Sequence, residues 1–200
     1  MTSGPASQRD FLPALLRLPR ELRDEIYTHL FPPMSASITT PAPHPSSNNS
    51  IPIGTQPPST RVNTQLRHET LPLFYHNTTF QLALTGPIEL MVVKAWLRSI
   101  GDGNVWCLRR VVMSGWVRVP FGHMVSRRWV ELLLDLRDGG VEEVVRKDGD
   151  GVKHPRVGAI VERVRAGLKR LEVGGDQGVG VDVKGLCELM EVFYGACVAY

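Results

Sequence analysis

The sequence predicts an α+β fold, with helices at the N-terminus followed by mixed strands and helices packed as one domain. Apolar residues recur every four positions between residues 18 and 30, which is the pattern of an amphipathic helix. Phe80, Leu82 and Leu84 alternate with polar or small residues, as in a strand that is buried on one side. Further helical and strand patterns follow, and 200 residues suffice for one domain with a core.

The first helix is expected to begin at Pro19, because proline is favoured at the first helical position. The carboxylate of Glu21 is placed to reach the free backbone N–H groups of the first turn. Pro32 and Pro33 are expected to end the helix. Its apolar side consists of Leu18, Leu22, Ile26 and Leu30.

The next segment has a different composition. Eight of the fifteen prolines lie between Pro32 and Thr60, with many Ser, Thr and Asn residues and no Asp, Glu, Lys or Arg. Such a segment buries too little apolar surface to offset the entropy lost on ordering. The chain is therefore expected to consist of a helical part at 1–31, a flexible Pro/Ser-rich insertion at 32–60 and an α+β part at 61–200.

Beyond the insertion, residues 62–74 predict a helix that Pro72 kinks or interrupts. The alternating strand at 80–84 ends at Gly86-Pro87. A buried helix is expected at 88–100, closed by Gly101, and a core strand at 107–116. Three more helices are expected at 125–136, 155–171 and 183–194, separated by glycine-rich turns.

The charge balance points to no polyanionic partner. The chain carries 23 basic and 20 acidic side chains, a formal net charge of +3, whereas a nucleic-acid surface usually clusters one sign of charge. No apolar run reaches the roughly 20 residues of a membrane-spanning helix. The N-terminal stretch MTSGPASQRDFLPALL lacks the continuous apolar region of a signal peptide. We therefore expect no nucleic-acid partner and no membrane partner.

The sequence shows no recognisable catalytic or metal motif. His68-Glu69 would need a second His where Pro72 stands to resemble a zinc-protease helix. The run GGDQGVG at 174–180 lacks a phosphate-loop ending, and Asp148 to Gly151 lacks the terminal Glu of a calcium loop. We expect no enzymatic activity, no cofactor and no metal.

The tryptophans and cysteines are expected to have structural roles. Core or half-buried packing is expected for Trp96, Trp106, Trp116 and Trp129. Reduced thiols are expected for Cys107, Cys187 and Cys197.

Two segments carry a family resemblance. LLRLPRELRDEIYTHLF, at 15–31, resembles the opening of an F-box, and specifically that of fungal F-box-like proteins. Such proteins commonly continue with a segment similar to TRVNTQLRHETLPLFYHNTTF, which stands at 60–80. The related fungal two-EXR domain has two Glu-x-Arg motifs, whereas this sequence has one, Glu21-Leu22-Arg23.

The resemblance implies a non-enzymatic protein-interaction module in the cytoplasm or nucleus. In F-boxes the Leu-Pro helix docks on the adaptor subunit of an SCF ubiquitin ligase, and the remaining domain holds a substrate protein. An alternative is an F-box-derived scaffold whose first helix packs its apolar side on residues 61–84 and binds no adaptor. The partner-binding candidates implied by the resemblance are Leu18, Pro19, Leu22, Ile26 and Leu30.

Overall fold

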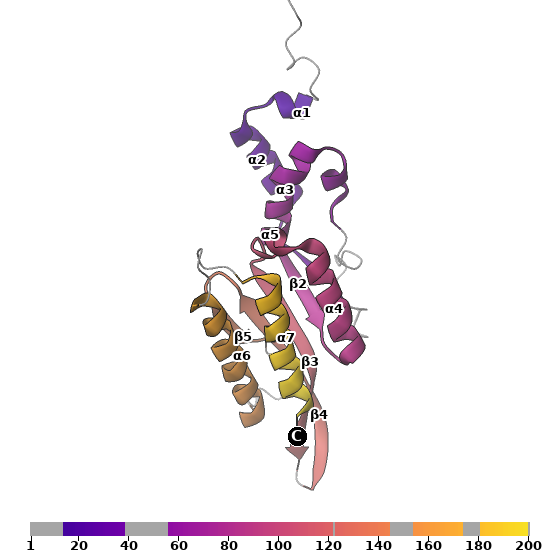
Figure 1. Ribbon diagram of the computed structural model, residues 1–200, viewed down its shortest axis with the longest axis vertical. Helices are drawn as coiled ribbons and strands as arrows, with labels where there is room; N and C mark the ends of the chain where they lie inside the picture. The colour runs from indigo at the N-terminus through magenta and orange to yellow at the C-terminus, as the bar shows by residue number, and fades with distance from the viewer. Residues whose placement is uncertain (1–13, 39–55, 122, 145–153, 174–180, 200) are drawn as a thin grey trace, which may run out of the picture.

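A computed structural model describes residues 14–38, 56–121, 123–144, 154–173 and 181–199. The chain folds as one α+β domain in which a five-stranded mixed sheet is packed with helices, and further helices stand at the N-terminal end of the long axis (Figure 1). The α+β prediction is therefore confirmed. The glycine run at 174–180 and the loop at 148–151 lie outside the described residues.

The described helices are α1 (Ala14–Arg17), α2 (Arg20–Leu30), the 3-10 helix η2 (Pro58–Arg61), α3 (Thr64–Asn77), α4 (Pro87–Ile100), α5 (Asp102–Val105), α6 (Pro155–Val173) and α7 (Val183–Val198). The strands are β1 (Met34–Ser37), β2 (Thr78–Ala83), β3 (Arg110–Phe121), β4 (Met124–Asp135) and β5 (Gly140–Glu143). None of these helices is both long and apolar enough to cross a membrane.

The sheet has the strand order β1-β2-β3-β4-β5. The pairs β1-β2 and β2-β3 are parallel, whereas β3-β4 and β4-β5 are antiparallel. This change of direction follows from the connections, because parallel neighbours need a crossover and antiparallel neighbours need only a hairpin. The chain from β1 to β2 includes η2 and α3, and the chain from β2 to β3 includes α4 and α5.

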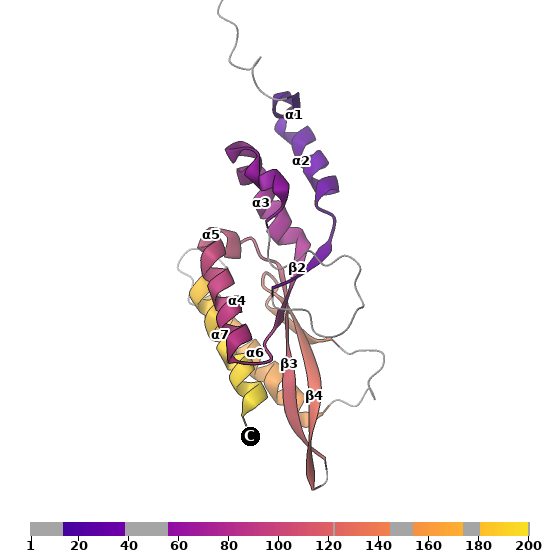
Figure 2. The ribbon, with the colours of Figure 1, turned by 90° about the vertical axis from the view of Figure 1, so that its right-hand side faces the viewer.

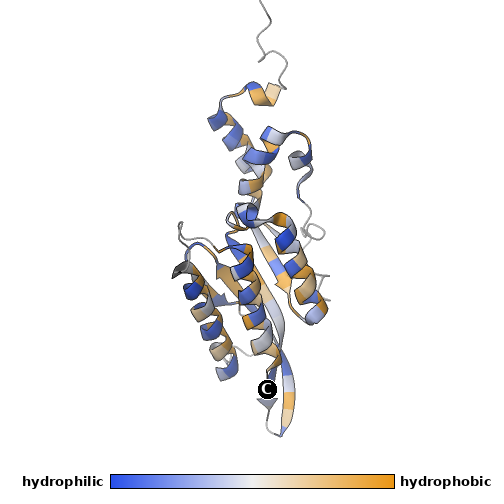
Figure 3. Cartoon of the chain, viewed as in Figure 1, coloured by the Kyte–Doolittle hydropathy of each residue, from blue (hydrophilic) through white to orange (hydrophobic). Residues whose placement is uncertain are grey.

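Helices α4, α6 and α7 lie together on one side of the sheet (Figure 2). Hydrophobic and hydrophilic residues alternate along α6 and α7, as expected of helices with one covered side (Figure 3). Helix α7 approaches β3 closely at Gly115, where an added Cβ would stand 3.3 Å from Phe193 Cε1 and 3.5 Å from Cys197 Sγ. The side chains that fill this core include Val111, Met113, Val117, Leu132, Leu134, Leu189 and Phe193.

The helix expected at 125–136 is wrong, because this segment forms strand β4. Val130, Leu132, Leu134 and Leu136 are buried, and the residues between them are more exposed. That period of two is the signature of a strand with one covered face. Leu133 lies on the opposite face of the strand but is also apolar. Residues 132–134 therefore form a continuous run of leucines, which hides the alternation in the sequence.

The insertion at 32–60 was expected to be flexible, but its two ends are ordered. Residues 34–37 form β1 at the edge of the sheet, and Pro58 begins η2. Residues 39–55 lie outside the described part of the chain. Helix α3 runs through Pro72, which is exposed, instead of breaking there.

The bounds of the remaining elements follow the predictions closely, but the expectation of a buried helix at 88–100 is wrong, because Ile88, Met91 and Val92 are 67%, 64% and 41% exposed. The strand at 80–84, the helix at 88–100 and the helices at 155–171 and 183–194 correspond to β2, α4, α6 and α7. Gly101 closes α4 with a φ of 75°, which explains why glycine stands there. The strand expected at 107–116 begins later, at Arg110, and continues to Phe121.

Candidate functional site

Helix α2 presents an apolar stripe to solvent. Leu22, Ile26 and Leu30 are 53%, 41% and 53% exposed. Pro19 is also exposed, and Leu18 is half-buried. The structure thus places the five candidate partner-binding residues along one helix and the residues before it, with three of them forming the exposed apolar stripe of α2.

A different face of α2 is buried. Arg23, Tyr27 and Phe31 also recur every four residues, each one position after a member of the exposed stripe. One residue corresponds to a rotation of about 100° around the helix axis, so the two faces point in different directions. Tyr27 and Phe31 are 1% and 4% exposed, and Arg23 is 8% exposed.

The start of α2 differs from the sequence prediction. Arg20 is the first helical residue and Pro19 is the N-cap. Within the described residues no side-chain hydrogen bond caps this end, so Glu21 does not bond the free N–H groups as expected, although it does lie in the first turn, at the positive end of the helix dipole. Arg23 instead donates from Nη1 to the carbonyl oxygen of Leu18, at 2.6 Å, which ties the helix to the backbone just before it.

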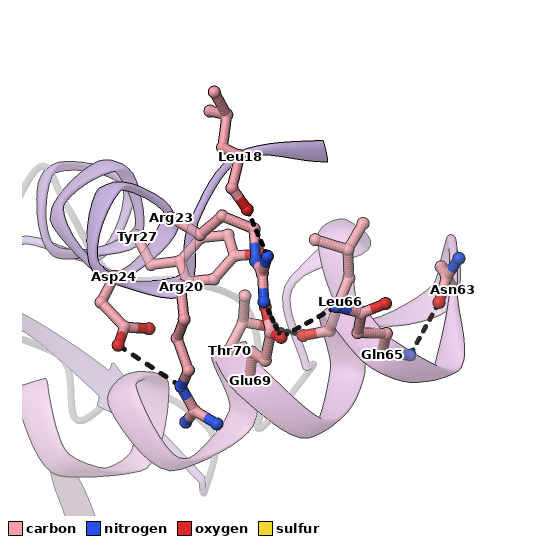
Figure 4. Close-up of polar contacts among 10 residues, drawn as sticks. All are labelled: Leu18, Arg20, Arg23, Asp24, Tyr27, Asn63, Gln65, Leu66, Glu69 and Thr70. Atoms are coloured by element: carbon pink, nitrogen blue, oxygen red, sulfur yellow. Dashed lines mark hydrogen bonds and ion pairs between the residues drawn. The ribbon is translucent and has the colours of Figure 1, made fainter. Parts of the chain in front are cut away.

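The buried polar contact between α2 and α3 centres on Glu69 (Figure 4). Arg23 donates from Nε to Glu69 Oε2 at 3.0 Å and from Nη2 to Glu69 Oε1 at 2.6 Å. The hydroxyl of Tyr27 donates to Glu69 Oε2 at 2.9 Å. The two parallel bonds of the guanidinium fix the orientation as well as the distance between the two helices.

Helix α3 positions Glu69 for this contact. Asn63 caps α3 by accepting a hydrogen bond from the backbone N–H of Gln65, at 2.7 Å. Gln65 donates from Nε2 to Glu69 Oε1, at 3.1 Å, from one turn earlier on the same helix. The carboxylate therefore accepts bonds from three side chains, which satisfies its lone pairs although its side chain is only 9% exposed.

The electrostatics follow from these bonds. The hydrogen bonds from Arg23 lower the pKa of Glu69 from 4.5 to about 2, against the opposing effect of burial. Burial and the bond to Glu69 raise the pKa of Tyr27 above its ordinary value. Glu69 is consequently ionised and Tyr27 protonated at neutral pH, which is the state that the observed hydrogen bonds require.

A second set of contacts fixes the end of α2. Phe31 packs edge-on against Phe74 of α3, with ring centroids 6.2 Å apart. Asn77 donates from Nδ2 to the carbonyl oxygen of Phe31, at 2.9 Å. Because α2 is attached to α3 at both ends, its rotation is set, and the stripe of Leu22, Ile26 and Leu30 is directed away from this contact.

This arrangement differs from the alternative in which the apolar side of α2 packs on residues 61–84. Helix α2 does pack on α3, but through Arg23, Tyr27 and Phe31. Sequence reasoning missed Arg23, Tyr27 and Glu69 as a set. Two signals were present: the second four-residue repeat in α2, and Glu69 within the second family-like segment.

The described residues include several potential metal ligands and three cysteines. They contain no group of three or more His, Cys, Asp or Glu side chains that could hold a metal ion. Burial raises the pKa of the Cys197 thiol to about 12, which opposes thiolate chemistry. A groove of about 460 Å³ between α4 and α7 is lined largely by charged residues, and Lys94 forms an ion pair with Glu191 there.

Comparisons with protein-family models, with curated proteins and with solved structures found no match for this chain. The exposed apolar stripe of α2, on a helix whose other face is fixed to α3, is therefore the main structural observation that bears on function.

Proposed function

We propose that the protein is a non-enzymatic, F-box-like interaction module of the cytoplasm or nucleus. In this proposal the exposed stripe of α2 binds the adaptor subunit of an SCF-type ubiquitin ligase, and the rest of the domain holds a substrate protein. The observation that carries it is the exposure of Leu22, Ile26 and Leu30 on a helix whose other face is fixed to α3.

The stripe has the chemistry of a docking surface. Transferring one leucine or isoleucine side chain fully from water to an interface contributes about 1.5 to 3 kcal/mol. Three such side chains at positions i, i+4 and i+8 form one continuous strip that fits a groove between helices of a partner. A few buried apolar anchors of this kind usually dominate the affinity of an interface.

The position of α2 also favours docking. Helices α1, α2 and α3 stand at one end of the long axis, beyond the end of the sheet (Figures 1 and 2). A partner can therefore approach α2 without displacing the helices that cover the sheet. The same position separates α2 from the sheet and from the helices that cover it (Figures 1 and 2).

A calorimetric titration of the full chain with the adaptor subunit tests this function. The proposal expects saturable binding that weakens at least about tenfold in a Leu22→Asp, Ile26→Asp double variant, because two anchors are replaced by charges. The matched control is Ile88→Asp, Met91→Asp, since these two residues are 67% and 64% exposed on α4. Absence of binding by the wild-type chain, or equal loss in the control, would contradict the proposal.

A further inference from the structure

The exposed stripe of α2 has a different neighbour on each side. One residue along a helix corresponds to about 100° around its axis, so the positions just after the stripe residues lie on one side and the positions just before them lie on the other. The later positions form the face that packs on α3. The earlier positions are Glu21, Glu25 and His29. This row, called the acidic border below, therefore follows the side of the stripe that points away from α3.

The acidic border is exposed and has no lysine or arginine partner among the described residues. Glu21 is exposed in the first turn of α2. The side chains of Glu25 and His29 are 75% and 80% exposed, and Glu25 Oε1 lies 3.5 Å from His29 Nε2. The two arginines of α2 are engaged elsewhere, since Arg20 pairs with Asp24 and Arg23 pairs with Glu69. Two carboxylates thus lie along the open side of the stripe without a fixed positive charge beside them.

This combination limits what can cover the stripe. Where two helices pack through apolar stripes, the residues that flank the stripes meet each other and select the partner. Flanking residues of opposite charge attract the partner, and like charges suppress wrong partners. Lysine and arginine have a further advantage at such a border, because their apolar stems cover neighbouring apolar surface while the charged group stays in water.

We propose that the partner covers the α2 stripe with an amphipathic helix whose apolar side is bordered by lysine or arginine residues. The apolar side packs on Leu22, Ile26 and Leu30, and the basic residues pair with Glu21 and Glu25. A second copy of α2 fits less well, because antiparallel packing of two copies brings their acidic borders together. This inference rests on the docking role proposed for the stripe and adds the charge of the surface that docks there.

The test is a fluorescence-anisotropy titration of the full chain with labelled helical peptides of about 20 residues, a length at which isolated helices form. Each peptide carries a stripe of leucines, flanked by Lys in the first peptide, by Gln in the second and by Glu in the third. We expect the Lys peptide to bind most tightly and the Glu peptide most weakly. The affinity of the Lys peptide should fall as salt rises from about 0.05 to 0.5 M, because exposed charges are screened.

Two variants separate the charged border from the apolar stripe. The border variant is Glu21→Gln, Glu25→Gln, and it should weaken binding of the Lys peptide at least about threefold at low salt and reduce the salt dependence. The stripe variant is Leu22→Ala, Ile26→Ala, which removes two anchors without adding charge. It should weaken binding at least about tenfold. Thermal unfolding checks that each variant is folded.

The control for net charge is Glu162→Gln, Glu188→Gln. These two side chains are 69% and 57% exposed on α6 and α7, and their loss changes the net charge by the same amount as the border variant. This control should bind the Lys peptide like the wild type.

A second control concerns other exposed apolar side chains, which also attract a leucine-rich peptide. Trp106 and Trp116 are 59% and 46% exposed, so the prediction of core or half-buried packing is wrong for both. Trp106→Ala and Trp116→Ala should each bind the Lys peptide like the wild type. Weaker binding by either would place the peptide away from α2 and would overturn the inference.

The remaining outcomes distinguish the inference from the function on which it rests. Equal binding of the Lys and Glu peptides, or unchanged binding by the border variant, would overturn the basic partner helix, and loss in the stripe variant would then leave the docking role intact. Binding that only the border variant loses would contradict both. Self-association of the wild-type chain that the stripe variant abolishes would assign the stripe to a second copy. Failure of the Lys peptide to bind would overturn the inference, while the adaptor titration decides the proposed function separately.

Discussion

The guanidinium of Arg23 on α2 donates two hydrogen bonds to the carboxylate of Glu69 on α3, at 3.0 Å and 2.6 Å. This ion pair determines which side of α2 is buried. A charged residue is buried at low cost only when its partner satisfies it fully. Glu69 meets this condition for Arg23, so the face with Arg23, Tyr27 and Phe31 is turned inward and the apolar stripe of Leu22, Ile26 and Leu30 is turned outward.

Stability should depend on pH through Glu69. Because the folded-state pKa of Glu69 is lowered from 4.5 to about 2, its contribution is complete above pH 4.5 and is lost as the pH falls toward 2. A Glu69→Gln variant should have a lower unfolding midpoint than the wild type at neutral pH, and the difference should narrow over that interval. Thermal unfolding of both proteins at a series of pH values measures this difference in midpoint.

Glu21→Gln is the matched control for this experiment, because Glu21 is an exposed carboxylate on the same helix pair. Its unfolding midpoint should follow that of the wild type at each pH. The difference in unfolding midpoint between Glu69→Gln and the wild type could instead stay constant down to pH 2. That result would show that the ionised carboxylate does not hold the two helices together.

The hydroxyl of Tyr27 should contribute to the same contact. Tyr27→Phe removes a buried donor to an ionised carboxylate, so we expect a loss of about 1 to 3 kcal/mol in the free energy of unfolding. Tyr194→Phe is the control, since the Tyr194 hydroxyl has no hydrogen-bond partner within the described ranges. Denaturant titrations compare the two, and equal stability of both variants would argue against the Tyr27 bond.

Pro72 should limit the stability of α3. Proline in a helix interior removes the hydrogen bond to the carbonyl four residues earlier, here that of His68. Pro72 is exposed, so Pro72→Ala restores this bond without disturbing the core. We expect a gain of about 1 to 3 kcal/mol in the free energy of unfolding, measured in denaturant. An unchanged or lower stability would indicate that the helix is not continuous through residue 72.

Gly115 should tolerate no side chain. A Cβ there would stand 3.2 Å from the carbonyl oxygen of Leu84 and 3.3 Å from Phe193 Cε1. Gly115→Ala is therefore expected to lower the free energy of unfolding by about 1 to 3 kcal/mol through overpacking. Gly195→Ala on α7 meets nothing within 4 Å and should gain about 0.5 to 1 kcal/mol. If both substitutions raised the free energy of unfolding, or both lowered it, the result would contradict the packing of α7 on β3.

The sequence predicts the elements whose signals are local. Gly101 marks the end of α4, and the alternation at Phe80, Leu82 and Leu84 marks β2. Strand β4 was mistaken for a helix because its outward Leu133 hides the alternation of its buried residues. Strand β1 was missed because four small or weakly apolar residues form a strand only when β2 supplies the hydrogen bonds.

The candidate site was half predictable for a related reason. The apolar repeat of α2 is visible in the sequence, but the orientation of the helix is not. Two stripes recur every four residues, and an apolar one is ordinarily the buried one. In α2 the apolar stripe is instead the exposed one, because Arg23 on the other stripe pairs with Glu69, which is 46 positions away in the chain.

The unfolding midpoint of the Leu22→Asp, Ile26→Asp variant tests the central claim most directly, because it needs no partner. If the stripe is exposed, the variant should unfold cooperatively and lose less than about 1 kcal/mol, as surface substitutions do. If the stripe is buried, two uncompensated charges in the core should abolish cooperative unfolding. That second result would contradict the orientation of α2 and, with it, the docking function.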